Sequence, residues 1–292
     1  MYGECHAHII MDGRNYKTAV SLHRDHVQDS IIHKAFQAYR EAGITFVRDG
    51  GDALGVSARA RELAPLYGID YRTPLFAIHK NGYYGGIVGY GFDTIEEYAA
   101  LVSRVSREHG DFIKIMASGI LDFDEFGKVS TPLQEPALIR EMVSIAHQEG
   151  FSVMVHVNTP QQICLALEAG CDSIEHGYYM DDTCRELLLE TGAVWVPTLA
   201  TCGNLRGCGR FNEDAVTRIT DCHMENVRLA LEKGIHIAAG SDAGAYLVPH
   251  GKGLYDEVDL LKEACQGQPD LLEKLEQSLT CSQQIIKQKF RR

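Results

Sequence analysis

Six residues that can bind a divalent metal ion occur in series along the chain, each in or directly after a short apolar run. They are His6, His8, Lys114, His156, His176 and Asp242. Histidine nitrogens and carboxylate oxygens are the ligands that zinc prefers, and manganese, cobalt or iron can replace zinc at such sites. The series predicts a site for two divalent metal ions, with zinc favoured. Two metals held together commonly activate water for hydrolysis.

Lys114 differs from the other five because it lies inside the apolar run 112–116. A charged amine in the interior of a domain is costly unless it is neutralised or paired. A buried lysine loses its proton readily and becomes nucleophilic. Capture of carbon dioxide would convert it into an anionic carbamate able to bridge two metals. We therefore expect two divalent ions and carbon dioxide, as a carbamate on Lys114, to be the cofactors.

Strand-like apolar runs alternate with helical segments along the whole chain, a pattern typical of a parallel sheet. Eight runs are expected to form strands, at residues 2–6, 44–48, 73–78, 112–116, 152–156, 173–176, 193–197 and 235–241. Helices are expected between them, for example over 134–148 and 214–232, and a terminal helix within 268–292. Glycine follows several of these helices directly, as at Gly192 and Gly234, where it favours helix termination.

Eight such units on 292 residues predict an α/β fold, a closed (β/α)8 TIM barrel, as one domain over 1–292. A doubly wound open sheet is the alternative, but no Gly-x-Gly-x-x-Gly follows the first strand. In a barrel all strand C-termini emerge on one face, so residues far apart in the sequence meet there. His6 and His8 are two residues apart, the period of a strand, and therefore point to the same side.

The composition of the chain limits the classes of molecule that it is expected to bind. The chain carries a net charge of −12, which argues against nucleic acids and anionic membrane surfaces, and no segment is apolar enough to span a membrane. The nine cysteines form no Cys-x-x-Cys pair and suit a reducing compartment, so a cytoplasmic protein is expected. The partner is expected to be a small molecule, and an anionic one would be attracted by the residual positive charge of the metals. The oligomeric state stays open, a homo-oligomer included.

Substrate-binding candidates lie near the expected strand ends. Residues 81–92 mix glycines with aromatic residues and could cover the substrate as a flap or form an ordinary solvent loop. The candidates for contacts with the substrate are His79, Tyr83, Tyr84, Tyr178 and His250.

The same residues resemble the amidohydrolase superfamily, in particular its binuclear branch with a carbamylated lysine, which includes imidazolonepropionase-like and Xaa-Pro dipeptidase-like enzymes. The resemblance extends from His6 to about Glu263. It is carried by FIKIMASG at 112–119, DSIEHG at 172–177, VPTLAT at 196–201, and GSDAG with PHG within 240–251. The resemblance implies that His6, His8 and Asp242 hold the more buried metal, that His156 and His176 hold the other, and that Lys114 bridges both.

Two features depart from the family pattern. Family members usually have aspartate two residues before the first histidine, whereas this chain has Glu4. Most members also carry a flanking β-sandwich domain, and we expect this chain to be a barrel without one, as either a naturally barrel-only or a shortened member.

The expected activity is metal-dependent hydrolysis of an amide bond by a metal-bridging hydroxide, with Asp242 as general base and then acid. The resemblance favours a dipeptide or an N-acyl amino acid. The alternatives are a lactonase or esterase, a heterocycle deaminase, or a barrel that binds metal without catalysis. Deaminases of the superfamily carry glutamate shortly after the fifth-strand histidine, but here His156 is followed by Val157, Asn158, Thr159 and Pro160.

Overall fold

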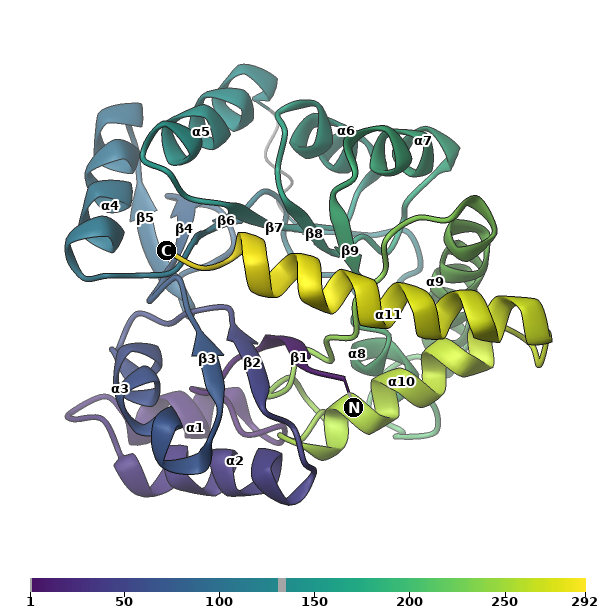
Figure 1. The fold of residues 1–292 in the computed structure, drawn as a ribbon, viewed down its shortest axis with the longest axis horizontal. Helices are drawn as coiled ribbons and strands as arrows, with labels where there is room; N and C mark the ends of the chain where they lie inside the picture. Colours follow the sequence, from purple (N-terminus) through teal and green to yellow (C-terminus); the bar gives the residue numbers. More distant parts are fainter. Residues whose placement is uncertain (1, 131–134) are drawn as a thin grey trace.

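The computed structural model describes residues 2–130 and 135–292, which form an α/β fold built on parallel strands. Nine strands occur in this part of the chain. One sheet has the order β1 (Glu4–Ala7), β2 (Phe46–Asp49), β3 (Asp70–Arg72). The other has the order β5 (Gly89–Phe92), β4 (Ala77–Lys80), β6 (Ile113–Met116), β7 (Val153–Val157), β8 (Ser173–His176), β9 (Val194–Val196) (Figure 1).

The expected third strand, 73–78, is not one strand. Its region is split into β3 and β4, which pair with β2 and β6 respectively. Pro74 lacks an N–H donor and Leu75 has a φ of 69°, so the intervening residues cannot continue a regular ladder. Thr73 instead exchanges two 2.9 Å hydrogen bonds with Asp111, which precedes β6. One segment thus joins the two sheets.

The expected eighth strand, 235–241, forms only an isolated bridge, between Ile237 and Trp195. The segment nevertheless lies between β9 and β1. Ala238 N–H donates to Trp195 O at 2.9 Å, and Cys5 N–H donates to Ala239 O at 3.0 Å. The predicted parallel α/β architecture is confirmed and is TIM-barrel-like. The ladder of strand hydrogen bonds does not close into a ring in the described part of the chain, so the prediction of a closed barrel is corrected.

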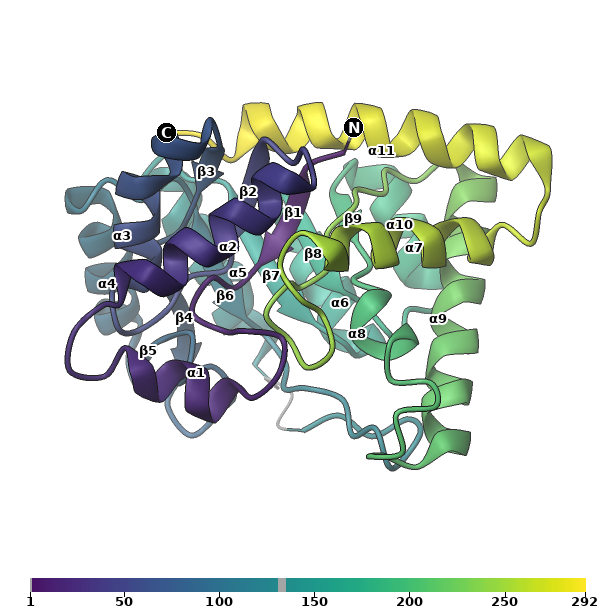
Figure 2. The same ribbon diagram turned by 90° about the horizontal axis from the view of Figure 1, so that it is seen from below.

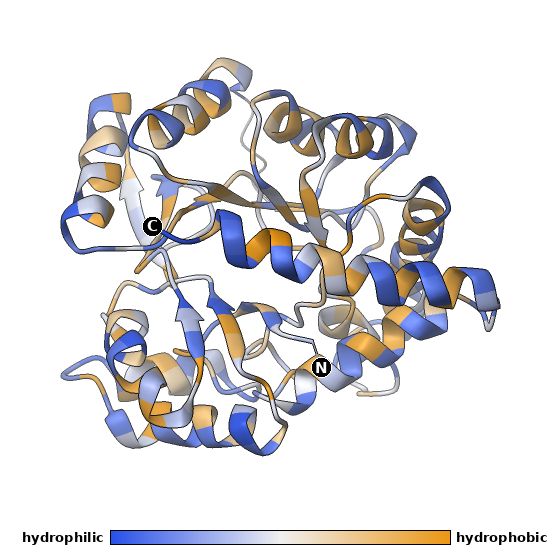
Figure 3. Ribbon diagram, viewed as in Figure 1, coloured by the Kyte–Doolittle hydropathy of each residue, from blue (hydrophilic) through white to orange (hydrophobic). Residues whose placement is uncertain are grey.

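Helices cover the outside of the strands, and the longer ones combine hydrophobic and hydrophilic positions along their length (Figure 3). Their bounds are α1 Tyr16–Leu22, α2 Asp29–Glu41, α3 Val56–Leu63, η1 Ala64–Tyr67, α4 Ile95–Arg107, α5 Pro136–Gln148, α6 Pro160–Glu168, α7 Asp182–Thr191, α8 Ala200–Gly203, α9 Glu213–Lys233, α10 Lys252–Ala264 and α11 Pro269–Lys289. The helices expected over 134–148 and 214–232 are confirmed as α5 and α9, although Gln134 lies outside the described residues. Gly192 and Gly234 end α7 and α9 with φ of 66° and 79°.

The terminal helix α11 covers one end of the barrel. It crosses in front of the strands in Figure 1 and lies along one edge of the molecule in Figure 2, whereas α1 lies at the opposite edge. Ile286 and Phe290 pack into a buried apolar cluster that includes Phe46 on β2, Phe112 just before β6 and Met154 on β7. The Phe290 and Phe112 ring centroids are 5.3 Å apart. Because this end is filled by apolar side chains, a site for polar chemistry is left to the other end.

Candidate metal centre

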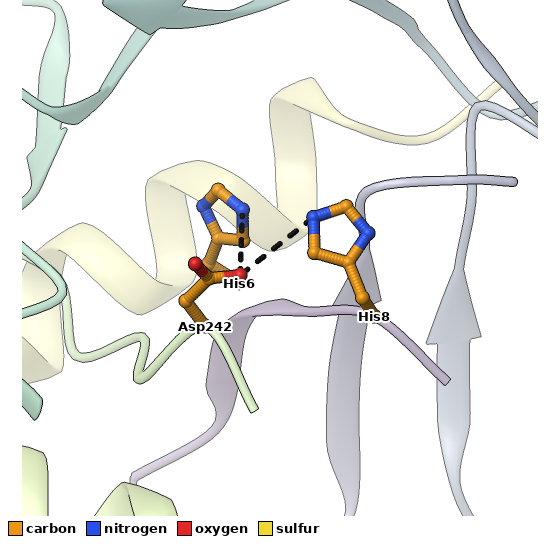
Figure 4. A group of neighbouring side chains, drawn as sticks. All are labelled: His6, His8 and Asp242. Atoms are coloured by element: carbon orange, nitrogen blue, oxygen red, sulfur yellow. Dashed lines mark ion pairs between the residues drawn. The ribbon is translucent and has the colours of Figure 1, made fainter. Parts of the chain in front are cut away.

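The first group of candidate ligands joins β1 to the residue that follows the 235–241 segment. His6 and His8 both extend toward Asp242, as Figure 4 shows. Nε2 of each imidazole lies 3.6 Å from Asp242 Oδ1. Asp242 is held there by its N–H, which donates to His6 O at 2.8 Å. The three ligand atoms lie within 4.8 Å of one another, a spacing that one divalent ion could span.

His156 and His176 lie beside this group, on β7 and at the end of β8. Their ring centroids are 4.5 Å apart, and that of His176 is 4.9 Å from His6. His176 Nδ1 is paired with Thr198 Oγ1 at 2.8 Å, which fixes its ring and leaves Nε2 as the free nitrogen. His156 Nε2 lies 3.1 Å from Gly119 O, so a cation bound there would replace this contact.

Lys114 lies on β6 within the same cavity and is only 1% exposed. No described residue provides a hydrogen-bond partner for its Nζ. Burial lowers the pKa of Lys114 to about 8, although the Glu175 carboxylate acts in the opposite direction. The amine can therefore lose its proton near neutral pH, as carbamate formation requires.

Three candidate ligands each have a buried atom that lacks a hydrogen-bond partner among the described residues: His6 Nε2, Lys114 Nζ and Asp242 Oδ1. Such orphaned atoms are costly in a folded protein and are normally satisfied by a partner. The histidines are also in the neutral form that binds metal, because burial lowers the pKa of His8 and of His156 to about 3. The set of nitrogen and oxygen donors fits divalent cations.

A buried chain of polar groups supports His6 from behind. His6 Nδ1 lies 2.6 Å from Glu175 Oε2, and Glu175 Oε1 accepts a 2.8 Å hydrogen bond from Arg48 Nη2. Arg48 also donates to Cys5 O at 2.7 Å and to Ser173 Oγ at 2.9 Å. The sequence prediction missed Arg48. Its signal was a charged residue at an inward position of the strand-like run 44–48.

Glu4, the departure from the family pattern, is fully buried and joins two ligand-bearing segments. Its Oε1 accepts hydrogen bonds from Ser241 N–H at 2.7 Å and from His6 N–H at 3.3 Å, and its Oε2 accepts one from Ser241 Oγ at 2.6 Å. Burial raises the pKa of Glu4 to about 7. The longer side chain therefore anchors the residue next to Asp242.

The ligand cluster opens into a cavity of about 830 Å³. His8, Lys114, His156, His176 and Asp242 all contribute to its lining, whereas His6 lies beneath them, fully buried. This volume is in the range of sites for small molecules.

Two of the five substrate-binding candidates, Tyr84 and Tyr178, line the cavity, and the Tyr84 ring is 5.3 Å from His156. The described lining does not include His79, Tyr83 or His250.

The three candidates outside the lining have other neighbours. His250 lies between Tyr39 Oη at 3.0 Å and Met11 O at 2.8 Å, so both of its ring nitrogens are occupied by protein groups. His79 Nδ1 contacts Lys80 O at 3.0 Å, and Tyr83 packs half-buried against the main hydrophobic core. The structure thus brings together all six candidate ligands and only two of the five substrate-binding candidates.

The segment 81–92, for which the sequence leaves open both a flap and an ordinary solvent loop, is in part a strand, because β5 occupies Gly89–Phe92 and pairs with β4. A side chain at Gly89 would collide with the backbone oxygen of Ala77, so the pairing requires glycine there. The segment between β4 and β5 still contributes Tyr84, Ile87 and Val88 to the cavity. In the described part of the chain, no helix has the length and apolar character needed to cross a membrane.

Comparison with known proteins finds relatives with a similar amino-acid sequence. An uncharacterized protein of Mycobacterium tuberculosis is 29% identical over 185 residues, which is 60% of this chain and 48% of that protein. The ochratoxinase of Aspergillus niger is 29% identical over 192 residues, which is 63% of this chain and 38% of that enzyme. The matches thus span less than half of the length of these relatives.

Solved structures share the fold over almost the whole chain. A Xaa-Pro dipeptidase with bound methionine superposes with a TM-score of 0.76 at 22% identity, covering 98% of this chain and 75% of that one. The A. niger ochratoxinase has a TM-score of 0.74 at 20% identity, covering 94% and 68%. The model of the family described as "Amidohydrolase family" matches residues 4–283. The chain therefore belongs to the amidohydrolase family.

Proposed function

We propose that this protein is a metal-dependent hydrolase that cleaves an amide bond in a dipeptide or N-acyl amino acid. In this proposal His6, His8 and Asp242 hold one divalent ion, and His156 and His176 hold a second. Lys114, carbamylated by carbon dioxide, would hold both ions. The observation that carries the proposal is the group of orphaned atoms His6 Nε2, Lys114 Nζ and Asp242 Oδ1, which no protein group satisfies among the described residues.

The protein's own residues would divide the work of catalysis. When bound, the two cations would supply Lewis acidity, which activates a water molecule and polarises the scissile carbonyl. The Asp242 carboxylate, through the oxygen that is not a metal ligand, would accept the proton of that water and later deliver it to the leaving amine. Glu175 and Arg48 would hold the His6 ring in place from below.

Similarity to dipeptidases supports the choice of substrate. Solved structures with the same fold include a Xaa-Pro dipeptidase and a prolidase complexed with N-methylphosphonate-L-proline. The cavity of about 830 Å³ has room for a dipeptide or a larger N-acyl amino acid. Hydrolysis of a lactone and deamination of a heterocycle remain the alternative activities within the superfamily. The non-enzymatic alternative is a barrel that binds metal without catalysis.

The test is turnover on a panel of dipeptides, N-acyl amino acids, lactones and aminated heterocycles. We expect hydrolysis of amides that is abolished by chelation and restored by zinc or manganese with bicarbonate. Asp242→Asn should lower kcat by about 10²- to 10⁴-fold, the usual contribution of a general base, with an unchanged circular dichroism spectrum. Asp259→Asn, at an exposed position on α10, is the matched control. Turnover only on heterocycles, or wild-type kcat in Asp242→Asn, would contradict the proposal.

A further inference from the structure

Basic side chains gather around the cavity although the chain carries a net charge of −12. Apart from Lys114 at the ligand cluster, the basic residues of the lining are Arg14, Lys17, Lys128 and Arg210. The lining also contains Asp122, Asp124 and Asp242, so the cations that attract an anionic ligand are those that no carboxylate neutralises.

Only one of these four outer cations is neutralised by carboxylates. Lys128 Nζ pairs with Asp122 at 2.9 Å and with Glu125 at 2.8 Å. Asp124, also in the lining, accepts the backbone N–H of Asn212 at 2.8 Å. Arg14, Lys17 and Arg210 therefore have no carboxylate partner within the described part of the chain.

Arg210 is held in place by aromatic rings. Its guanidinium carbon lies 4.3 Å from the centroid of the Tyr246 ring and 5.1 Å from that of Phe211. All three residues line the cavity. Cation–π contacts with these rings hold the guanidinium without using its N–H donors. These donors make no hydrogen bond to any described residue, so a preoriented fork of donors is available to a ligand.

The arginine and its aromatic support are tied to the ligand cluster. Tyr246 belongs to the loop that follows Asp242, and this loop exchanges hydrogen bonds with Gly13: Gly13 N–H donates to Gly244 O at 3.0 Å, and Leu247 N–H donates to Gly13 O at 2.7 Å. His8 N–H donates to Ala243 O at 2.8 Å. The Tyr246 side of the cavity is thus fixed relative to the candidate ligands His8 and Asp242.

The wall across the barrel is apolar. Ile87 and Val88 follow β4, and Met116 ends β6. These residues line the cavity and pack together with Tyr84. In the order of strands around the barrel, β4 and β6 lie opposite β9 and the 235–242 segment, which lead to Arg210 and Tyr246. The cavity lining therefore combines an apolar wall of Ile87, Val88 and Met116 with Arg210 and its aromatic neighbours, beside the ligand cluster.

We propose that Arg210 binds the free carboxylate of the substrate, on the amine side of the scissile bond, while the acyl group packs against Ile87, Val88 and Met116. This inference deepens the proposed function and rests on it. It assigns the substrate class as amides whose leaving group is a free amino acid. Amides of the same size without a carboxylate should be poor ligands.

The test uses a ligand that cannot be hydrolysed. It is the ketone isostere of N-benzoylglycine, in which a methylene group replaces the amide nitrogen, prepared as the free acid and as the neutral carboxamide. Dissociation constants are measured by calorimetry on the metal-loaded protein. Arg210→Gln is compared with the control variant Arg206→Gln. Arg206 lies in the same loop, but its guanidinium pairs with Glu263 at 2.8 Å. In parallel, kcat and KM are measured for N-benzoylglycine and N-benzoylglycinamide.

We expect the wild type and Arg206→Gln to prefer the acid. Arg210→Gln should weaken binding of the acid by about 10- to 100-fold, the range for a hydrogen bond to a charged group, and leave the carboxamide unchanged. KM for N-benzoylglycine should rise in the same proportion, with little change in kcat. Arg210→Lys should retain part of the preference.

Equal affinity of the wild type for acid and carboxamide, including no measurable binding of either, would overturn the inference, and so would an equal loss for both ligands in Arg210→Gln. A preference for the acid that disappears in Arg210→Gln, in a protein that cleaves no amide, would support the carboxylate site while contradicting the proposed function.

Discussion

Replacing Arg48 by methionine tests the buried network behind the candidate metal centre. Arg48 is fully buried, and its guanidinium donates hydrogen bonds to Cys5 O, Ser173 Oγ and Glu175 Oε1 at 2.7 to 2.9 Å. It also lies 4.4 Å from the centroid of the Phe290 ring. Methionine fills much of the same volume but removes every donor, so the Glu175 carboxylate stays buried without its cation.

The expected loss is large. Breaking a buried ion pair by removing one partner costs about 3–5 kcal/mol of unfolding free energy, because the remaining charge is left uncompensated. If that charge is the cause, adding Glu175→Gln to Arg48→Met should recover at least about 1 kcal/mol, because a neutral amide is cheaper to bury. The double variant should then be more stable than the single one.

The measurement is urea unfolding followed by circular dichroism at neutral pH. Arg59→Met is the control, because Arg59 pairs with Asp29 and Glu62 at an exposed position where solvent screens the charges. It should destabilise far less than Arg48→Met. Equal losses in Arg48→Met and Arg59→Met, or further destabilisation by Glu175→Gln, would refute the reasoning.

Three further predictions concern the barrel end, a buried acid and the first ligand strand. Phe290→Ala should lower the unfolding free energy by about 3–5 kcal/mol, because it empties the cluster that closes the barrel; a loss below about 1 kcal/mol in urea unfolding would contradict this role. Burial raises the pKa of Glu257 from 4.5 to about 8, so the folded state binds the proton more tightly and stability should fall as pH rises from about 4.5 to about 8. Glu257→Gln, which keeps an acceptor for Ala200 N–H, should flatten this pH dependence in thermal unfolding, and an unchanged slope would disprove it. A methyl group at Gly50 would overlap the His8 ring, so Gly50→Ala should lower the metal content without unfolding the protein; full metal content would contradict this placement.

The convergence of the candidate ligands could be predicted because it depends on topology alone. Residues at strand C-termini of a parallel barrel meet whatever the loops do. His6 and Asp242 are therefore neighbours although they lie at opposite ends of the sequence. The same rule also holds for the 235–241 segment, which reaches the correct place without forming a regular strand.

The remaining features depend on packing that hydrophobic periodicity does not encode. The break at Pro74 and Leu75 lies inside the apolar run 73–78, and the strand Gly89–Phe92 contains two glycines, which normally disfavour a strand. His250 follows the ligand strands closely in sequence, yet it is not part of the cavity lining, and its ring nitrogens contact Tyr39 Oη and Met11 O. Arg210, in contrast, lies in a loop whose conformation the spacing of ligands does not constrain.

Metal content per chain tests the central claim most directly. The protein would be purified without chelator, supplied with zinc and bicarbonate, and examined by elemental analysis beside Lys114→Ala. We predict about two divalent ions per chain in the wild type, and fewer in Lys114→Ala because the bridging anion is lost. No bound metal in the wild type, or two ions that are retained in Lys114→Ala, would contradict a binuclear centre bridged by Lys114.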